Sequence, residues 1–195
     1  MGATVSSVET YVDLNPDVEV AARPLTLEEF FALPYELIEL VEGQPIIMSA
    51  ASGPHQVAAM RLSLMLIANC PDGYEVVQSP IDWILWDEPH ATVRQPDVVV
   101  GRLEQLVRAP LTEPPLLAVE IISNSSVERD TVAKRNDYAR AGCPHYWLVL
   151  PSRTEIVRLR LDGDAYVEIG RINGTKPVTV DEPYSITVDP SRLAV

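Results

Sequence analysis

Residues 116–142 read LLAVEIISNSSVERDTVAKRNDYARAG, which combines an apolar strand with a helical pattern. The strand LLAVEII carries Glu120 in its middle, where an ionised carboxylate is costly unless a cation compensates it. The helical pattern runs from about residue 130 to 141 and contains Lys134, and Gly142 stops it. The strand therefore requires a partner for Glu120, which is either a basic side chain or a metal ion.

The sequence on either side predicts an α/β fold, a mixed β-sheet flanked by helices. Thr26 and Glu29 form a capping box that opens a short helix, which Pro34 ends. A β-hairpin is expected around residues 42–43, and a helix of about four turns follows Pro54. Further strands are expected at residues 74–80, 81–86, 95–101, 145–150, 154–161 and 165–169. We expect residues 1–25 to form an N-terminal arm and residues 26–195 to form a single domain with a C-terminal β-hairpin extension.

Composition and charge limit the classes of function. The chain has 195 residues, of which 47% are hydrophobic and 22% charged, as in a globular domain with a large core. No apolar run is long enough to span a bilayer and the N-terminus lacks a signal-peptide pattern, so we expect a cytoplasmic protein. Cys70 and Cys143 fit neither a disulfide framework nor a zinc site, and we interpret them as reduced structural residues.

The net charge of −13 argues against a protein that holds nucleic acid by bulk electrostatics. Residues 1–45 carry nine acids and only one basic residue, Arg23, a net charge of −8, which leaves −5 of the −13 on the remaining 150 residues. A local basic groove is therefore compatible with the composition.

Two acids occupy positions where a core strand does not need them, Asp97 in QPDVVV and Glu120 in AVEII. Taken singly, an Asp after proline is typical of a turn and a strand Glu often faces solvent. Converging from neighbouring strands, they form a hard-oxygen site suited to Mg²⁺ or Mn²⁺. Lys134 is one of two lysines, and a partly buried lysine can position or deprotonate a water. The alternative to a catalytic role is that Lys134 is a solvated charge on the helix, paired with Asp130.

A series of motifs resembles a known family. QPDVVV, AVEIISNSSVERD and KRNDYARAGCPHYWLV, preceded by ELVEG and MSAASGPHQ, are similar to the Uma-type restriction endonucleases of the PD-(D/E)xK nuclease superfamily. The resemblance covers about residues 26–160. It implies a restriction-endonuclease-like core, in which Asp97 and Glu120 bind the metal and Lys134 is the catalytic lysine. The position two after Glu120 is Ile122 rather than lysine, so this reading needs the lysine to have moved to the following helix.

The resemblance adds further candidates to the site. Glu39, in ELVEG, is expected to extend the metal shell, and His55 is expected to contact substrate or metal unless it is only a surface residue at a helix start. Four arginines flank the proposed site as candidate phosphate contacts, namely Arg94, Arg129, Arg135 and Arg140.

The expected activity is Mg²⁺- or Mn²⁺-dependent hydrolysis of DNA phosphodiester bonds by an endodeoxyribonuclease. We expect weak, salt-sensitive binding to DNA and a homodimer that pairs through an exposed strand edge. One alternative is a catalytically inactive, nuclease-like binding or assembly domain, in which Glu120 and Lys134 form a buried ion pair. Another alternative is a hydrolase for small phosphoesters.

Overall fold

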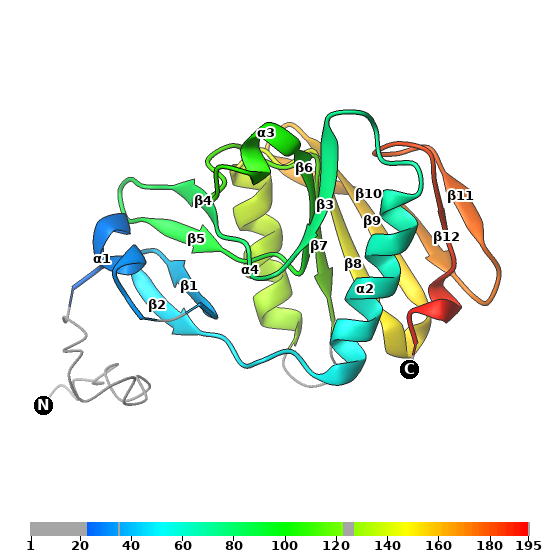
Figure 1. Ribbon diagram of the computed structural model, residues 1–195, viewed down its shortest axis with the longest axis horizontal. Coiled ribbons are helices and arrows are strands. Elements are labelled where there is room, and N and C mark those ends of the chain that lie inside the picture. Colours follow the sequence, from blue (N-terminus) through cyan, green and yellow to red (C-terminus); the bar gives the residue numbers. More distant parts are fainter. Residues whose placement is uncertain (1–22, 35, 123–126, 195) are drawn as a thin grey trace, which may run out of the picture.

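The computed structural model describes residues 23–34, 36–122 and 127–194, with the side chains of residues 127–131 outside the description. The expected N-terminal arm therefore lies almost wholly outside the described residues. Within them, the mixed β-sheet flanked by helices that the sequence predicts is confirmed (Figure 1). No helix in these ranges is long and apolar enough to cross a membrane.

A six-stranded sheet forms the centre of the molecule, in the order β10-β9-β8-β7-β6-β3. Neighbouring strands are antiparallel except for β7 and β8, which are parallel and are joined through helix α4. A parallel pair needs such a crossover connection, which explains why the strand and helix of residues 116–142 occur together. The strands are β3 (Tyr74–Gln78), β6 (Val98–Arg102), β7 (Leu117–Ile121), β8 (His145–Leu150), β9 (Glu155–Asp162) and β10 (Ala165–Asn173).

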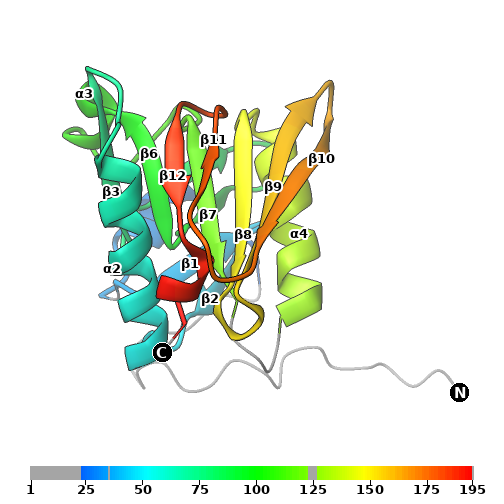
Figure 2. The ribbon, with the colours of Figure 1, turned by 90° about the vertical axis from the view of Figure 1, so that its right-hand side faces the viewer.

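Each face of this sheet is covered by different elements, as Figure 2 shows. Helix α2 (Gly53–Ile67) and the hairpin of β11 (Val178–Val180) and β12 (Ile186–Val188) pack on one face. Helix α4 (Val127–Arg140) packs on the other. Because successive strand residues point to opposite faces, Val119 lies in the core beside α2 whereas Ala118 lies in the core beside α4. Glu120 therefore faces α4.

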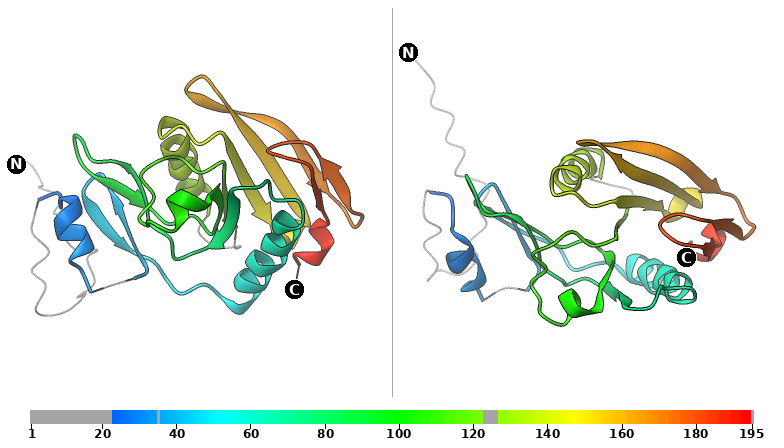
Figure 3. Two further views of the ribbon diagram at one scale, coloured as in Figure 1. Left: turned by 45° about the horizontal axis from the view of Figure 1, so that its top comes forward. Right: turned by 90° about the horizontal axis from the view of Figure 1, so that it is seen from above.

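A second sheet, in the order β2-β1-β5-β4, lies to one side of the central sheet (Figure 3). It has its own small core with helix α1 (Leu27–Phe31), which buries Phe30, and Trp83 of β4 joins it to the larger core near α4. A parallel bridge between Trp83 and Leu111 also connects it to the rest of the chain. Its strands are β1 (Ile38–Val41), β2 (Gln44–Ile47), β4 (Trp83–Trp86) and β5 (Thr92–Arg94).

Several local predictions are confirmed. The Thr26 capping box is present, and the β1–β2 hairpin turns through Glu42 and Gly43, both with positive φ. The sequence did not predict strand β5, helix α3 (Leu103–Leu106), the β11–β12 hairpin, or the short 3-10 helices Pro151–Arg153 and Pro190–Arg192. Each of these elements has three or four residues, too few to show a period. The β9–β10 hairpin belongs to the central sheet, in which β9 pairs with β8 and β10 is the edge strand.

Candidate active site

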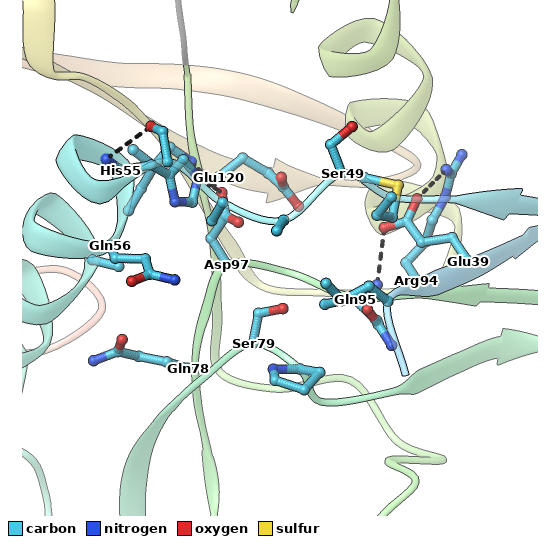
Figure 4. Close-up of a pocket in the computed structure, with 18 of the residues that line it drawn as sticks. Glu39, Ser49, His55, Gln56, Gln78, Ser79, Arg94, Gln95, Asp97 and Glu120 are labelled. Carbon is cyan, nitrogen blue, oxygen red and sulfur yellow. Dashed lines mark hydrogen bonds and ion pairs between the residues drawn. The ribbon is translucent and has the colours of Figure 1, made fainter. Parts of the chain in front are cut away.

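Strand register brings the two predicted acids together. Strands β6 and β7 pair antiparallel with Val98 opposite Val119, so Asp97, which directly precedes β6, lies opposite Glu120. Oδ2 of Asp97 accepts a hydrogen bond from the backbone N–H of Ile121 at 2.7 Å. Figure 4 shows both carboxylates at the same pocket. Like charges directly opposite each other are unfavourable, so this pair calls for a cation.

Lys134 of helix α4 supplies one positive charge to this pair. Its side chain is 9% exposed, and Nζ lies 3.1 Å from each carboxylate oxygen of Glu120. Nζ also lies 3.0 Å from Oε1 of Glu39, on the neighbouring sheet. The alternative in which Lys134 is a solvated helix charge is therefore wrong, because the ammonium is buried between two carboxylates.

Tyr138 lies one helical turn after Lys134 and holds the same carboxylate. Its hydroxyl donates a hydrogen bond to Oε1 of Glu120 at 2.7 Å, and its side chain is fully buried. The ring stacks on Trp83 with centroids 5.2 Å apart, which fixes its position. Helix α4 therefore presents two donors to Glu120, at the i and i+4 positions that share a helix face.

Glu39 and Arg94 connect the small sheet to the site. Oε2 of Glu39 accepts from Arg94 at 2.8 Å, and Oε1 accepts from the backbone N–H of Gln95 at 3.0 Å. The Arg94 guanidinium also donates from Nε to Asp137 of α4 at 3.0 Å. Both oxygens of Glu39 are thus engaged, and it reaches the Asp97–Glu120 pair through Lys134. Arg94 has a 6% exposed side chain held by two carboxylates, a position that differs from the expected phosphate contact.

His55 lies at the start of α2, where Ser52 caps the helix by accepting from the His55 backbone N–H. The imidazole points toward the sheet, and Nε2 lies 3.1 Å from Oδ2 of Asp97. Its side chain is 17% exposed. The structure therefore brings His55 into the site, and the alternative of a surface ring is wrong.

Two of the other flanking arginines contact residues outside the site. Arg135 donates to the backbone carbonyl of Tyr166 at 2.7 Å, on strand β10. Arg140 lies over the ring of Trp86, 4.0 Å from its centroid. The side chain of Arg129 lies outside the described residues.

A pocket of about 670 Å³ contains the site (Figure 4). Its lining includes Glu39, His55, Arg94, Asp97, Glu120 and Lys134. Glu120 and Lys134 lie in its buried part, Asp97 is half-buried, and its exposed part includes residues 46–47, 49–52 and 79–80. The pocket lies where the small sheet, the central sheet and the start of α2 meet. Among the described side chains, the sequence-predicted residues thus gather at one pocket, apart from Arg135 and Arg140.

The electrostatics show a site that is short of positive charge. Burial raises the pKa of Glu120 to about 7, and the charges of Asp97 and Glu39 add to this although Lys134 opposes them. Burial disfavours the Lys134 ammonium, yet Glu120 and Glu39 outweigh it and raise its pKa, so Lys134 stays charged. The hydrogen bond to Asp97 raises the pKa of His55 despite partial burial. Four carboxylates share two permanent cations in this cluster: Glu39, Asp97, Glu120 and Asp137 with Arg94 and Lys134.

The side chains at this site include oxygen donors for a divalent cation. No group of three or more His, Cys, Asp or Glu side chains in the described part of the chain is arranged as a metal cage. Mg²⁺ does not require one, because it is usually bound by one or two carboxylates together with waters and substrate phosphate. Asp97 and Glu120 supply two hard oxygen ligands, and the raised pKa of Glu120 indicates that a further cation would relieve the site. The residues fit a Mg²⁺ or Mn²⁺ ion.

Sequence reasoning missed three members of this cluster. Tyr138 was detectable in principle, because it follows Lys134 at helical spacing. Gln95 and Asp137 were not, because their roles depend on where the small sheet packs against α4. Gln95 also donates through its side chain to Asp82 at 2.8 Å, which fixes the segment that leads into Asp97.

Comparisons with known proteins identify the family and the fold. The chain matches a family model named Uma2, described as "Putative restriction endonuclease", over residues 27–189. It is also similar to a solved structure from Anabaena variabilis, described as a "putative nuclease belonging to DUF820". That likeness has a TM-score of 0.70 at 17% identity, covers 87% of this chain and 97% of the other, and shows the fold. No curated protein matches the chain. Since the family model spans most of the sequence, the chain belongs to the Uma2 family.

Proposed function

We propose that this protein is a Mg²⁺- or Mn²⁺-dependent endodeoxyribonuclease that hydrolyses DNA phosphodiester bonds. The observation that carries the proposal is the convergence of Asp97 and Glu120 across β6 and β7, with the Lys134 ammonium 3.1 Å from Glu120. Family membership supports the reaction class. Paired carboxylates beside a buried lysine are suited to binding a divalent ion and a phosphate together.

Each residue has a role that follows from its contacts. Asp97 and Glu120 would hold the ion, which supplies charge stabilisation for the phosphate and makes a nearby water more acidic. Lys134 stays protonated, so it orients the attacking water and neutralises negative charge that develops on phosphorus oxygens, rather than removing a proton. Tyr138 fixes the rotamer of Glu120, and Glu39 fixes Lys134.

Binding of DNA in this proposal is weak and salt-sensitive. The net charge of −13 gives no general attraction to phosphates, and Arg94 is engaged by carboxylates. We further propose a homodimer, because β10 is an edge strand of the central sheet and offers unpaired backbone groups. A cytoplasmic location is part of the same proposal, since that is where a DNA substrate is reached.

The second candidate is a nuclease-like binding or assembly domain without catalysis. The observation that favours it is the Lys134 ammonium itself, which already pairs with Glu120 and Glu39 as a structural cation would. Under this alternative the carboxylates need no metal ion.

Thermal unfolding with and without divalent metal separates the two candidates. The nuclease proposal expects Mn²⁺ at about 100 times its Kd to stabilise the wild type by about 2.7 kcal/mol, roughly 5–10 °C in Tm. Asp97→Asn keeps an acceptor for the Ile121 N–H but removes a ligand charge, so it should abolish this gain. Asp164→Asn, at an exposed turn, is the matched control and should keep it. A wild type indifferent to both metals would favour the binding domain.

A further inference from the structure

One wall of the pocket is apolar although it faces water. We call Leu37, Ile46, Ile47, Met48 and Pro80 the apolar wall, because all five line the pocket. Leu37, Ile46 and Ile47 are 36%, 43% and 45% exposed. Ile46 lies opposite Glu39 in the β1–β2 register, so both side chains stand on the face that looks into the pocket. A cluster of large exposed apolar side chains beside a candidate catalytic site indicates a binding surface.

The cations of the pocket do not suit duplex binding. Among the described residues that line the pocket, the Lys and Arg side chains are Lys134 and Arg94. Both are buried between carboxylates. His55 is engaged by Asp97. A protein that binds a duplex contacts its phosphates with Lys and Arg side chains, because the base faces are stacked inside the helix and cannot be contacted. Within the described part of the chain, the pocket lining therefore offers no unpaired Lys or Arg side chain for phosphates.

The remaining polar groups suit the edge of an exposed base. Gln56 of α2 and Gln78 of β3 both line the pocket and lie on the same side of Asp97 in Figure 4. Ser79 lies beside them. Side-chain amides can donate to and accept from a base edge together, as the bidentate contact of Gln with adenine illustrates. Amides and an apolar wall thus surround the two carboxylates.

We propose that the pocket receives an unpaired nucleotide of a DNA strand, so that single-stranded or locally unpaired DNA is the substrate and intact duplex is not. This inference rests on the proposed hydrolysis, whose substrate class it names. A volume of about 670 Å³ is within the range of pockets that enclose a small ligand. Enzymes that act on single nucleotides enclose the extruded base between apolar side chains and contact its edge by hydrogen bonds. Here the apolar wall contacts the base face and the amides contact its edge, while the phosphate would meet the divalent ion that Asp97 and Glu120 would hold.

Binding and cleavage are measured on three substrates of one sequence: a labelled single strand, its duplex, and the duplex with an unpaired central bubble. Fluorescence anisotropy gives the affinities in Ca²⁺, an oxygen-binding cation that compensates the carboxylates, and Mg²⁺ or Mn²⁺ starts cleavage. The variant Ile46→Ser removes apolar area from the wall. Ile67→Ser is the matched control, since Ile67 is 49% exposed on α2 and does not line the pocket.

The inference expects tighter binding of the single strand and the bubble than of the duplex, and the same order in cleavage. Ile46→Ser should weaken single-strand binding about fivefold, while Ile67→Ser leaves it unchanged. Duplex binding as tight as single-strand binding, no binding of either, or equal effects of the two variants would overturn it. A single-strand preference without cleavage of any substrate would leave this inference standing and contradict the proposed hydrolysis.

Discussion

Replacing Lys134 with methionine removes the buried cation while keeping most of the side-chain volume. Glu39 retains Arg94 at 2.8 Å and the backbone N–H of Gln95 at 3.0 Å. Glu120 retains only the hydroxyl of Tyr138 among the contacts seen in the described residues. The loss therefore falls mainly on Glu120, whose carboxylate is left buried beside Asp97.

The expected magnitude follows from the cost of an unpaired buried charge. Removing one partner of a buried ion pair destabilises a protein by about 3–5 kcal/mol. For a chain of this size each kcal/mol shifts Tm by roughly 2–4 °C, so Lys134→Met should unfold about 6–20 °C below the wild type at pH 8. Protonation of Glu120 relieves the defect. Lys134 lowers the already raised pKa of Glu120, so its loss raises that pKa further. The folded variant therefore binds the proton at a higher pH than the wild type does, and its deficit shrinks as pH falls.

Differential scanning calorimetry of Lys134→Met at pH 8 and pH 6, without metal, measures both effects. The stability deficit relative to wild type should shrink at pH 6, by at most about 1.4 kcal/mol per pH unit. Lys176→Met is the control, since Lys176 is the other lysine and is exposed. A Lys134→Met protein as stable as this control, or a deficit that grows toward low pH, would refute the assigned ion pair.

Further predictions concern the supports of the site. Tyr138→Phe removes the donor to Glu120 and should lower the free energy of unfolding by about 1.5–3 kcal/mol in urea titration, with no loss if that hydrogen bond is unimportant. Arg94→Lys loses the planar guanidinium that donates to both Asp137 and Glu39, and should lower the free energy of unfolding by about 3 kcal/mol in calorimetry. Thr26→Ala removes the cap of α1 and should cost about 1 kcal/mol, measured by thermal unfolding. DNA affinity, weak already at low salt, should fall further at physiological salt in a filter-binding titration.

Local order was largely predictable from the sequence. The β1–β2 hairpin, helix α2 and the strand–helix unit of β7 and α4 follow from turn residues and hydrophobic periods. The acids Asp97 and Glu120 were recognisable because Glu120 interrupts an apolar strand and Asp97 directly precedes another. Their pairing could be suspected, but the register that sets Asp97 opposite Glu120 is a property of the folded sheet.

The long-range parts of the site could not be predicted. Arg94 lies in a strand of three residues, and its interaction with Glu39 and Asp137 depends on the packing of the small sheet beside α4. From the sequence alone, an arginine near the site is as compatible with a phosphate contact as with an ion pair inside the protein. The contact of His55 with Asp97 likewise depends on how α2 crosses the central sheet. Such interactions join segments that no local pattern connects.

Cleavage of supercoiled plasmid and of single-stranded DNA at low salt with Mg²⁺ or Mn²⁺ tests the central claim most directly. Wild type is compared with Asp97→Asn, Glu120→Gln and Lys134→Met, each assayed below its own unfolding temperature. The account predicts metal-dependent cleavage by the wild type and its loss in all three variants. No cleavage by a folded wild type with either metal, or full activity in any of the three variants, would contradict it.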